Sequence, residues 1–317
     1  MTRTVLVTGA SGFIGRDLVG RLAAAGWSVR AATRDPSSVV RSDRIEPVAV
    51  GDLAAATDWR RLVEGVSHIV HLAGIAHATA AIPEATYMAV NAQATRDLAV
   101  AARQAGAARI VFVSSVKAQC GPAAADVLTE TMSPQPDDAY GRSKLAGERM
   151  LAEALGGSRT DWCVLRPVVL YGPGVKANMR ALARLARLPL PLPLGALAAR
   201  RSLLGLGNFF AAVEHTLSSP ATARGTYLLA DPGPLTVPGI VAAMRQGLGR
   251  PPGLFGVPLG PARLVAMALG KGAAWDRISG DLVVSTAALQ ATGWRPVETA
   301  AEGIARWMSR DTGQPAA

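Results

Sequence analysis

Residues 4–15 read TVLVTGASGFIG, and this stretch decides the fold of the 317-residue chain. Residues 4–8 form a short apolar run typical of a buried strand, and residues 9–15 carry a glycine at every third position. A helical pattern of apolar residues follows as far as Ala25. A strand, a glycine turn and a helix start form a phosphate cradle, because glycines admit a pyrophosphate and the helix start offers free N–H groups. Three glycines alone also fit an ordinary tight turn, but this context predicts a dinucleotide site.

A second informative feature is the pair Tyr140 and Lys144, which lie in the run AYGRSK at residues 139–144. The residues that follow favour helix, and residues four apart share one face of a helix. A free tyrosine has a pKa near ~10, and a nearby cation is expected to lower it by favouring the phenolate. The pair then moves a proton to or from a hydroxyl or carbonyl oxygen. Such pairs also occur on solvated helix faces, and the glycine turn is what favours the catalytic interpretation.

Strand and helix patterns alternate through about residue 170. Strands are expected near residues 4–8, 28–33, 46–50, 67–72, 109–115 and 162–167, and helices at 13–25, 57–64, 84–105 and 137–155. This alternation predicts an α/β fold with a Rossmann-like, doubly wound parallel sheet. We expect a dinucleotide-binding domain at 1–170 with a return segment at about 205–230. A smaller C-terminal substrate-binding domain is expected at 171–204 and 231–317.

The composition of the chain limits the classes of protein to which it can belong. The net charge of +10 fits either solubility or attraction of an anionic cofactor and substrate. Dense basic runs with interleaved aromatics are missing, which argues against nucleic acid. No apolar stretch is long enough to span a membrane, and the chain enters its first strand at once, so no signal peptide is expected. The two cysteines, Cys120 and Cys163, suit a reducing compartment, and no metal-ligand spacing is present. We therefore expect a cytoplasmic protein without a metal.

These motifs closely resemble the extended short-chain dehydrogenase/reductase family, and in particular its epimerase/dehydratase branch, which acts on nucleotide sugars. The resemblance covers nearly the whole chain. Besides the glycine turn and the Tyr/Lys pair, it rests on residues 50–53 (VGDL), 71–74 (HLAG), 90–95 (VNAQAT), 110–115 (IVFVSS) and 166–174 (RPVVLYGPG). Ser115 closes its strand 25 positions before Tyr140 (140 − 115). The resemblance implies that Ser115, Tyr140 and Lys144 are the catalytic residues.

The motifs and the resemblance also give a set of cofactor-binding residues. Ser114 is a rival to Ser115, because neighbouring strand residues face opposite sides and only one of the two can face the site. Asn91 matches a family asparagine with a mainly structural role. The expected cofactor-binding residues are Gly9, Ser11, Gly12, Phe13, Ile14, Gly15, Arg34, Asp52, Leu53, Leu72, Ala73, Gly74, Asn91, Val113, Tyr140, Lys144, Pro167 and Val169.

The end of the second strand bears on which cofactor binds. An acidic residue there would hold the ribose 2′-hydroxyl of NAD. This chain instead reads AATRD at residues 31–35, which puts Thr33 near the acidic position and Arg34 after it. A guanidinium can bind a 2′-phosphate through two hydrogen bonds, and Arg16 is placed to help. We therefore favour NADP(H), with NAD(H) as the alternative if Arg34 is a solvent-facing residue that pairs with Asp35.

The resemblance implies a nucleotide-diphosphate sugar as substrate. Arg201 aligns with an arginine that grips the diphosphate, and Asn178 with an asparagine that contacts the phosphates. Arg277 is a candidate second clamp and His77 a candidate sugar contact. Each of the two also fits an ordinary surface or packing role.

Three functions compete. The favoured one is NADPH-dependent reduction of a 4-keto sugar nucleotide, supported by Arg34. The alternative is an NAD-dependent nucleotide-sugar 4-epimerase, similar to UDP-glucose 4-epimerase, which uses the same Ser-Tyr-Lys set. The third is a non-catalytic, cofactor-sensing binding protein, since a fold does not fix a function. The resemblance also implies a homodimer through helices near 84–105 and 137–155.

Overall fold

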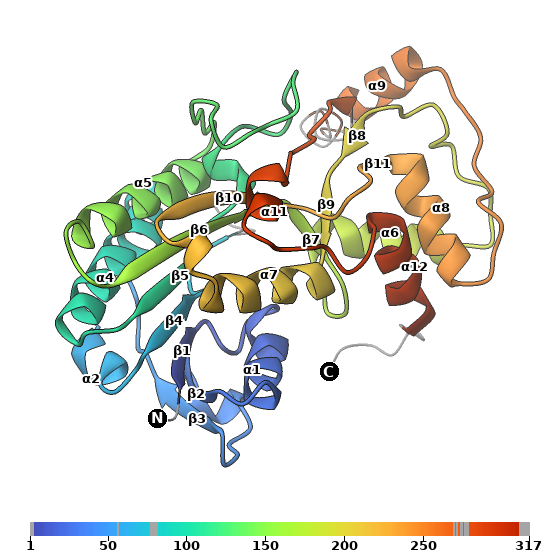
Figure 1. Cartoon of the computed structure of the whole chain (residues 1–317). Coiled ribbons are helices and arrows are strands. Elements are labelled where there is room, and N and C mark those ends of the chain that lie inside the picture. The colour runs from blue at the N-terminus through green and yellow to red at the C-terminus, as the bar shows by residue number, and fades with distance from the viewer. Residues whose placement is uncertain are drawn as a thin grey trace.

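The computed structural model describes residues 3–55, 57–76, 82–268, 270, 272, 275 and 279–310. A seven-stranded sheet dominates it, in the order β10-β6-β5-β4-β1-β2-β3 (Figure 1). Every neighbouring pair in this sheet is parallel. The strands are β1 (Thr4–Thr8), β2 (Ser28–Thr33), β3 (Ile45–Ala49), β4 (His68–His71), β5 (Arg109–Val113), β6 (Asp161–Pro167) and β10 (Gly225–Leu229). The predicted α/β fold with a Rossmann-like sheet is confirmed.

Helices connect these strands close to the predicted bounds. The predicted helix at 84–105 is three segments in succession, with a π-helix between two α-helices. The α-helices are α1 (Gly15–Ala24), α2 (Trp59–Val63), α3 (Glu84–Met88), α4 (Ala94–Gln104), α5 (Ala139–Ala154), α6 (Ala177–Arg187), α7 (Leu206–Ser218), α8 (Val237–Gly247), α9 (Leu259–Ala268), α11 (Ala287–Ala291) and α12 (Ala300–Arg310). The shorter turns are the π-helix η2 (Ala89–Gln93) and the 3₁₀ helices η1 (Pro36–Ser38), η3 (Val116–Ala118) and η4 (Pro220–Thr222).

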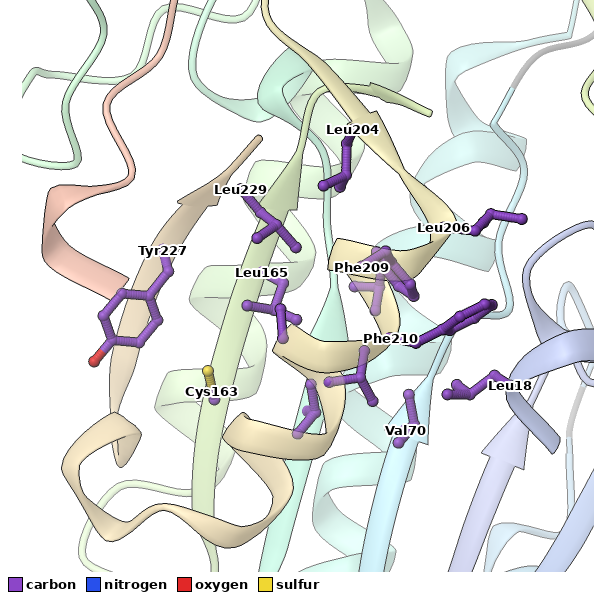
Figure 2. Packing of buried hydrophobic residues seen from close by; sticks show 14 of the residues in the cluster. Leu18, Val70, Cys163, Leu165, Leu204, Leu206, Phe209, Phe210, Tyr227 and Leu229 are labelled. Carbon is purple, nitrogen blue, oxygen red and sulfur yellow. The ribbon is translucent and has the colours of Figure 1, made fainter. Parts of the chain in front are cut away.

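The sheet is buried on both faces, because side chains of each strand alternate between two hydrophobic clusters. In β5, Ile110 and Phe112 join the cluster that includes Leu98 of α4 and Leu151 of α5. Val111 and Val113 join the cluster on the opposite face, under α1 and α7. Figure 2 shows Phe209 and Phe210 of α7 over this second face, near Leu165 and Val70. Helices α2, α4 and α5 thus cover one face, and α1 and α7 the other.

The chain leaves the sheet after β6 and returns to it later. Strand β10 pairs with β6 in the register Gly225↔Cys163 to Leu229↔Pro167. Between them the chain forms β7 (Val169–Tyr171), α6, β8 (Arg200–Arg201), β9 (Leu203–Gly205) and α7. The sheet thus gains an edge strand from far along the chain.

A smaller region packs beside the sheet, built from α6, α8 and α12 (Figure 1). Its core contains Met179, Val241, Met244 and Trp307. Two short pairs join it, β7 with β9 in parallel and β8 with β11 (Leu235–Thr236) in antiparallel orientation. Within the described residues, no helix is both long and apolar enough to cross a membrane.

Candidate active site

The glycine turn between β1 and α1 has the shape of a ligand cradle. Gly9 has φ of +71°, a left-handed conformation that favours glycine. A Cβ on Gly15 would overlap the carbonyl oxygen of Gly9, and one on Gly12 would lie 3.1 Å from it. In the described part of the chain, the N–H groups of Phe13 and Ile14 donate to no protein acceptor. Open N–H groups at a helix start are what a diphosphate requires, so the residues present fit a dinucleotide.

A buried hydrogen-bond chain fixes the end of β4 beside this turn. Thr8 Oγ1 accepts from the N–H of Ala73 at 3.1 Å and lies 2.7 Å from His71 Nδ1. His71 Nε2 lies 3.1 Å from Thr95 Oγ1, which donates to the carbonyl oxygen of Asn91. If the His71 ring carries its proton on Nε2, every donor and acceptor in this series of hydrogen bonds has a partner. Burial, and secondly the charge of Lys144, lower the pKa of His71 to about 3, so its ring is neutral at physiological pH.

Asn91 is a brace for the loop after β4. Its Oδ1 accepts from the N–H of Ile75 at 2.8 Å, and its Nδ2 donates to Ile75 O at 2.9 Å and to Ser143 Oγ at 3.0 Å. Both N–H groups of the amide are therefore occupied within the protein. Asn91 lies in the π-helix η2, a distortion that is frequent at functional sites. The side chain ties the loop carrying Gly74 to α5, which agrees with the structural role that the resemblance implies.

Ser115 and Tyr140 meet at the carboxyl end of β5. Ser115 follows the strand as the residue before η3, and a hydrogen bond joins its side chain to the Tyr140 phenol. Tyr140 lies in the first turn of α5, where Asp138 caps the helix by accepting from Gly141 N at 2.7 Å. The Tyr87 ring packs beside it, with ring centroids 6.3 Å apart. The serine hydroxyl and the phenol therefore lie within hydrogen-bond distance of each other.

The expectation that Lys144 lowers the pKa of Tyr140 is wrong for this structure. Burial raises the pKa of Tyr140 to about 12, and the hydrogen bond from Ser115 opposes this only in part. Lys144 is itself buried and points toward the strand: Nζ donates to Val113 O at 2.7 Å and lies 4.3 Å from the Phe112 ring centroid. Burial therefore sets the direction of the Tyr140 pKa, and the ammonium of Lys144 is held by the backbone of β5.

The same burial acts on Lys144. It lowers the pKa of the Lys144 ammonium to about 7, while the carboxylate of Glu148 raises it. A Cβ on Gly74 would lie 3.9 Å from Lys144 Nζ, so the loop after β4 also reaches this ammonium. Lys144 is thus a buried, weakly basic cation between β5 and the loop that follows β4.

Ser114 belongs to a separate buried network. Its hydroxyl donates to Glu148 Oε1, and Arg166 donates to both Glu148 oxygens, with Nε at 3.0 and 3.2 Å. Arg166 also donates to Gln119, whose Nε2 donates to Met132 O at 2.7 Å. The network joins β5, α5, β6 and the loop after η3 beneath the site. Ser114 is therefore used in this network, and Ser115 is the serine that meets Tyr140.

At the end of β2, Arg34 is exposed, and Thr33 is buried with Oγ1 2.6 Å from Ser11 Oγ. Asp35 caps η1 by accepting from Ser37, with N at 3.0 Å and Oγ at 2.7 Å. Its carboxylate is thus used locally. Arg16 Nε donates to the carbonyl oxygen of Ser11 at 2.9 Å, which braces the glycine turn.

Asp52 follows β3 and is exposed, and its Oδ1 accepts from Ala54 N at 3.0 Å. Leu53 and Leu72 pack partly buried against the two sheet clusters. Val113 ends β5, Pro167 ends β6, and Val169 is 51% exposed just beyond it. All of these residues lie at, or just after, the carboxyl ends of parallel strands, where ligands of such sheets bind.

Two of the four candidate substrate-binding residues lie in the described part of the chain, and two do not. Arg201 is half-buried in β8, and its Nη1 donates to Pro122 O at 2.6 Å, in the loop that follows Ser115 and η3. Asn178 is exposed in the first turn of α6. His77 and Arg277 lie outside the described residues. Sequence reasoning missed Glu148, whose signal is its position four residues after Lys144 on the same helix face.

The fold and the site define an enzyme with a dinucleotide cofactor on a Rossmann-like sheet. A model of the NAD-dependent epimerase/dehydratase family matches residues 5–226. A UDP-glucose 4-epimerase of Vibrio cholerae is 31% identical over 311 residues, covering 96% of this chain and 94% of that protein. The chain belongs to the NAD-dependent epimerase/dehydratase family and is an enzyme of it. This confirms the resemblance to the extended short-chain dehydrogenases acting on nucleotide sugars and favours an enzyme over a non-catalytic binding protein.

Solved structures agree on the fold. MoeE5 in complex with UDP-glucuronic acid and NAD superposes with a TM-score of 0.75 at 24% identity, covering 97% of this chain and 99% of that one. The UDP-glucose 4-epimerase of Thermus thermophilus, in complex with NAD, gives a TM-score of 0.74 at 24% identity, with coverage of 98% and 99%. At this identity the likeness supports the fold alone.

Proposed function

We propose that this enzyme is an NAD-dependent nucleotide-sugar 4-epimerase acting on a UDP-hexose. The observation that carries the proposal is the end-to-end similarity, at 31% identity, to the UDP-glucose 4-epimerase of Vibrio cholerae. The pairing of Ser115 with Tyr140 supports it, because this chemistry needs a proton carrier at a sugar hydroxyl. The alternative drawn from the sequence thus has better support than the reductase favoured there.

The chain's own residues supply proton transfer and positioning. NAD, when bound, supplies reversible hydride acceptance. Tyr140, in its phenolate form, would take the proton from the sugar 4-hydroxyl and return it to the 4-oxygen after the sugar has rotated. Because the pKa of the phenol is about 12 in the protein alone, the positive charge of the bound nicotinamide would have to favour that phenolate. Ser115 holds the same oxygen by a hydrogen bond. The residues that would hold the cofactor are the glycine turn, Asp52 and Lys144.

The substrate side of the proposal rests on Arg201 and Asn178. A guanidinium is a planar fork of donors that suits phosphate oxygens. Arg201 uses one nitrogen for Pro122 O, which orients the group and leaves further donors for a diphosphate. Asn178, in the first turn of α6, would contribute an amide to the same phosphates. This assigns the nucleotide end of the substrate to the smaller region of the molecule.

A second candidate is an NADPH-dependent reductase of a 4-keto sugar nucleotide. It is favoured by the exposed guanidinium of Arg34 at the end of β2, together with the local use of the Asp35 carboxylate by Ser37. An arginine at this place suits a 2′-phosphate, and a free carboxylate would exclude one.

The identity of the dinucleotide separates the two candidates. Purified protein is denatured, and the released dinucleotide is quantified by mass spectrometry. The proposal expects NAD in near-stoichiometric amount and interconversion of UDP-glucose and UDP-galactose without added reductant. Release of NADP, or an empty site that binds NADPH more tightly than NADH, would favour the reductase. Tyr140→Phe, which keeps the ring, should retain the dinucleotide and lose the interconversion.

A further inference from the structure

One outer edge of the smaller region combines exposed apolar and basic side chains. We define it as the α6 edge: Arg184, Leu185, Leu188, Leu190, Arg250 and Phe255. Leu188 is 43% exposed, Leu190 62% and Phe255 48%. Arg184 and Arg250 are exposed as well. Exposed apolar groups of this size, gathered with cations, mark a surface that contacts something other than water.

The two segments that form the α6 edge are held together. Leu192 and Leu254 form a bridge, and Gly195 N donates to Phe255 O at 2.9 Å. The buried Arg245 donates to Leu190 O at 2.7 Å and to Pro252 O at 2.7 Å, so one guanidinium fastens both segments. Arg250 Nη1 donates to Arg187 O at 2.6 Å. The two segments that carry these apolar and basic side chains are therefore held side by side by the fold.

Helix α6 shows why these side chains stay on the outside. Its inner face carries Met179, Ala183 and Ala186, which are buried in the cluster shared with α8 and α12. Arg180, Arg184 and Leu185 lie on the other face and are exposed. Because the apolar face of α6 is used inside the protein, its outer face presents arginine side chains and Leu185 to whatever lies outside.

The charge of this surface is one-sided. Residues 176–200 contain arginine and lysine, residues 244–261 contain arginine, and neither segment contains aspartate or glutamate. Neutralising acids are therefore missing from both segments, although the chain holds 23 acidic residues elsewhere. A basic surface with protruding leucine and phenylalanine complements a layer of anionic headgroups above acyl chains.

We propose that the α6 edge docks onto the surface of an anionic lipid bilayer, with Leu188, Leu190 and Phe255 entering the headgroup region and Arg184 and Arg250 contacting lipid phosphates. The docking is peripheral and reversible. It does not depend on which reaction the enzyme catalyses.

The test is co-sedimentation of the whole protein with vesicles of phosphatidylethanolamine and phosphatidylglycerol, compared with vesicles of phosphatidylcholine alone. We expect binding to the anionic vesicles that weakens as salt is added. Arg184→Gln with Arg250→Gln should weaken binding about thirtyfold, on the basis of about five- to sixfold for each arginine at such a surface. Leu190→Ser with Phe255→Ser should abolish pelleting.

Matched controls are Arg61→Gln on α2 and Val40→Ser after η1, which are exposed residues of the same types away from the α6 edge. They should bind vesicles like the unaltered protein. Circular dichroism and retained dinucleotide establish that each variant is folded. Failure of the unaltered protein to bind anionic vesicles, or equal binding by all variants, would overturn the proposal. If the α6-edge variants instead convert a dimer to a monomer in lipid-free buffer, the surface is a contact between copies of this chain, and the lipid proposal is also overturned.

Discussion

Lys144 Nζ and the carbonyl oxygen of Val113 lie 2.7 Å apart, and this bond turns the ammonium toward β5. The ammonium is buried there. Burial also raises the pKa of the Tyr140 phenol to about 12. Both groups are therefore less readily ionised here than in water, which makes the site sensitive to changes in burial.

The first prediction concerns the cost of burying Lys144. Its pKa of about 7 lies below the ordinary 10.5, so between these values the unfolded chain binds a proton that the folded chain has released. Stability should therefore rise with pH across this window. Lys144→Met removes the cost and should raise the free energy of unfolding at about pH 6 by on the order of 3 kcal/mol. Urea denaturation at about pH 6 and pH 10 measures this. A variant that is destabilised at the lower pH, or a difference independent of pH, would contradict the assignment.

Two glycines of the same helix give a matched comparison. A Cβ at Gly15 would overlap the backbone of Gly9 and Ala10, whereas one at Gly20 meets nothing within 4 Å. Gly15→Ala should abolish dinucleotide binding, measured by calorimetry. Gly20→Ala should bind normally and gain up to about 1 kcal/mol of stability, because alanine is the better helix former. Normal binding by Gly15→Ala would mean that the turn does not hold the diphosphate.

The two adjacent serines should behave differently. Ser115→Ala removes the hydroxyl that pairs with Tyr140 and should lower kcat about a hundredfold with little change in melting temperature. Ser114→Ala removes a donor to Glu148 in the buried network and should cost about 1–2 kcal/mol of stability while keeping most of the activity. Steady-state kinetics and thermal melts on both variants provide the comparison. If Ser114→Ala instead lost activity and Ser115→Ala lost only stability, Ser114 would be the serine that acts with Tyr140.

His71 should make the protein sensitive to acid. Its pKa of about 3 lies below the ordinary 6.5, so stability from this residue is complete above pH 6.5 and is lost as the pH falls toward 3. In the His71→Leu variant, the free energy of unfolding should fall less steeply with decreasing pH, by at most about 1.4 kcal/mol per pH unit. Denaturant midpoints across this range test it, and an unchanged slope would show that His71 does not titrate as assigned.

The sequence predicted those parts of the site that depend on local patterns. The turn between β1 and α1 is continuous in sequence, so the spacing of its glycines and the strand and helix patterns around it were sufficient to predict a strand, a turn and a helix in succession. The direction of the Tyr140 pKa was not predictable, since the burial of Tyr140 depends on the tertiary packing around it, including Tyr87 from a distant segment. The network of Ser114, Glu148 and Arg166 was missed for a related reason: its members come from three elements that only the folded sheet brings together.

The 4-epimerase proposal is tested most directly by following hydrogen at C4 of the sugar. UDP-glucose carrying deuterium at C4 is incubated with the enzyme and NAD, without external reductant, and the product is analysed by NMR and mass spectrometry. The account predicts UDP-galactose with the deuterium retained at C4, because hydride leaves and returns within one site. No conversion with this or another UDP-hexose, together with NADPH-dependent reduction of a 4-keto sugar nucleotide, would contradict it.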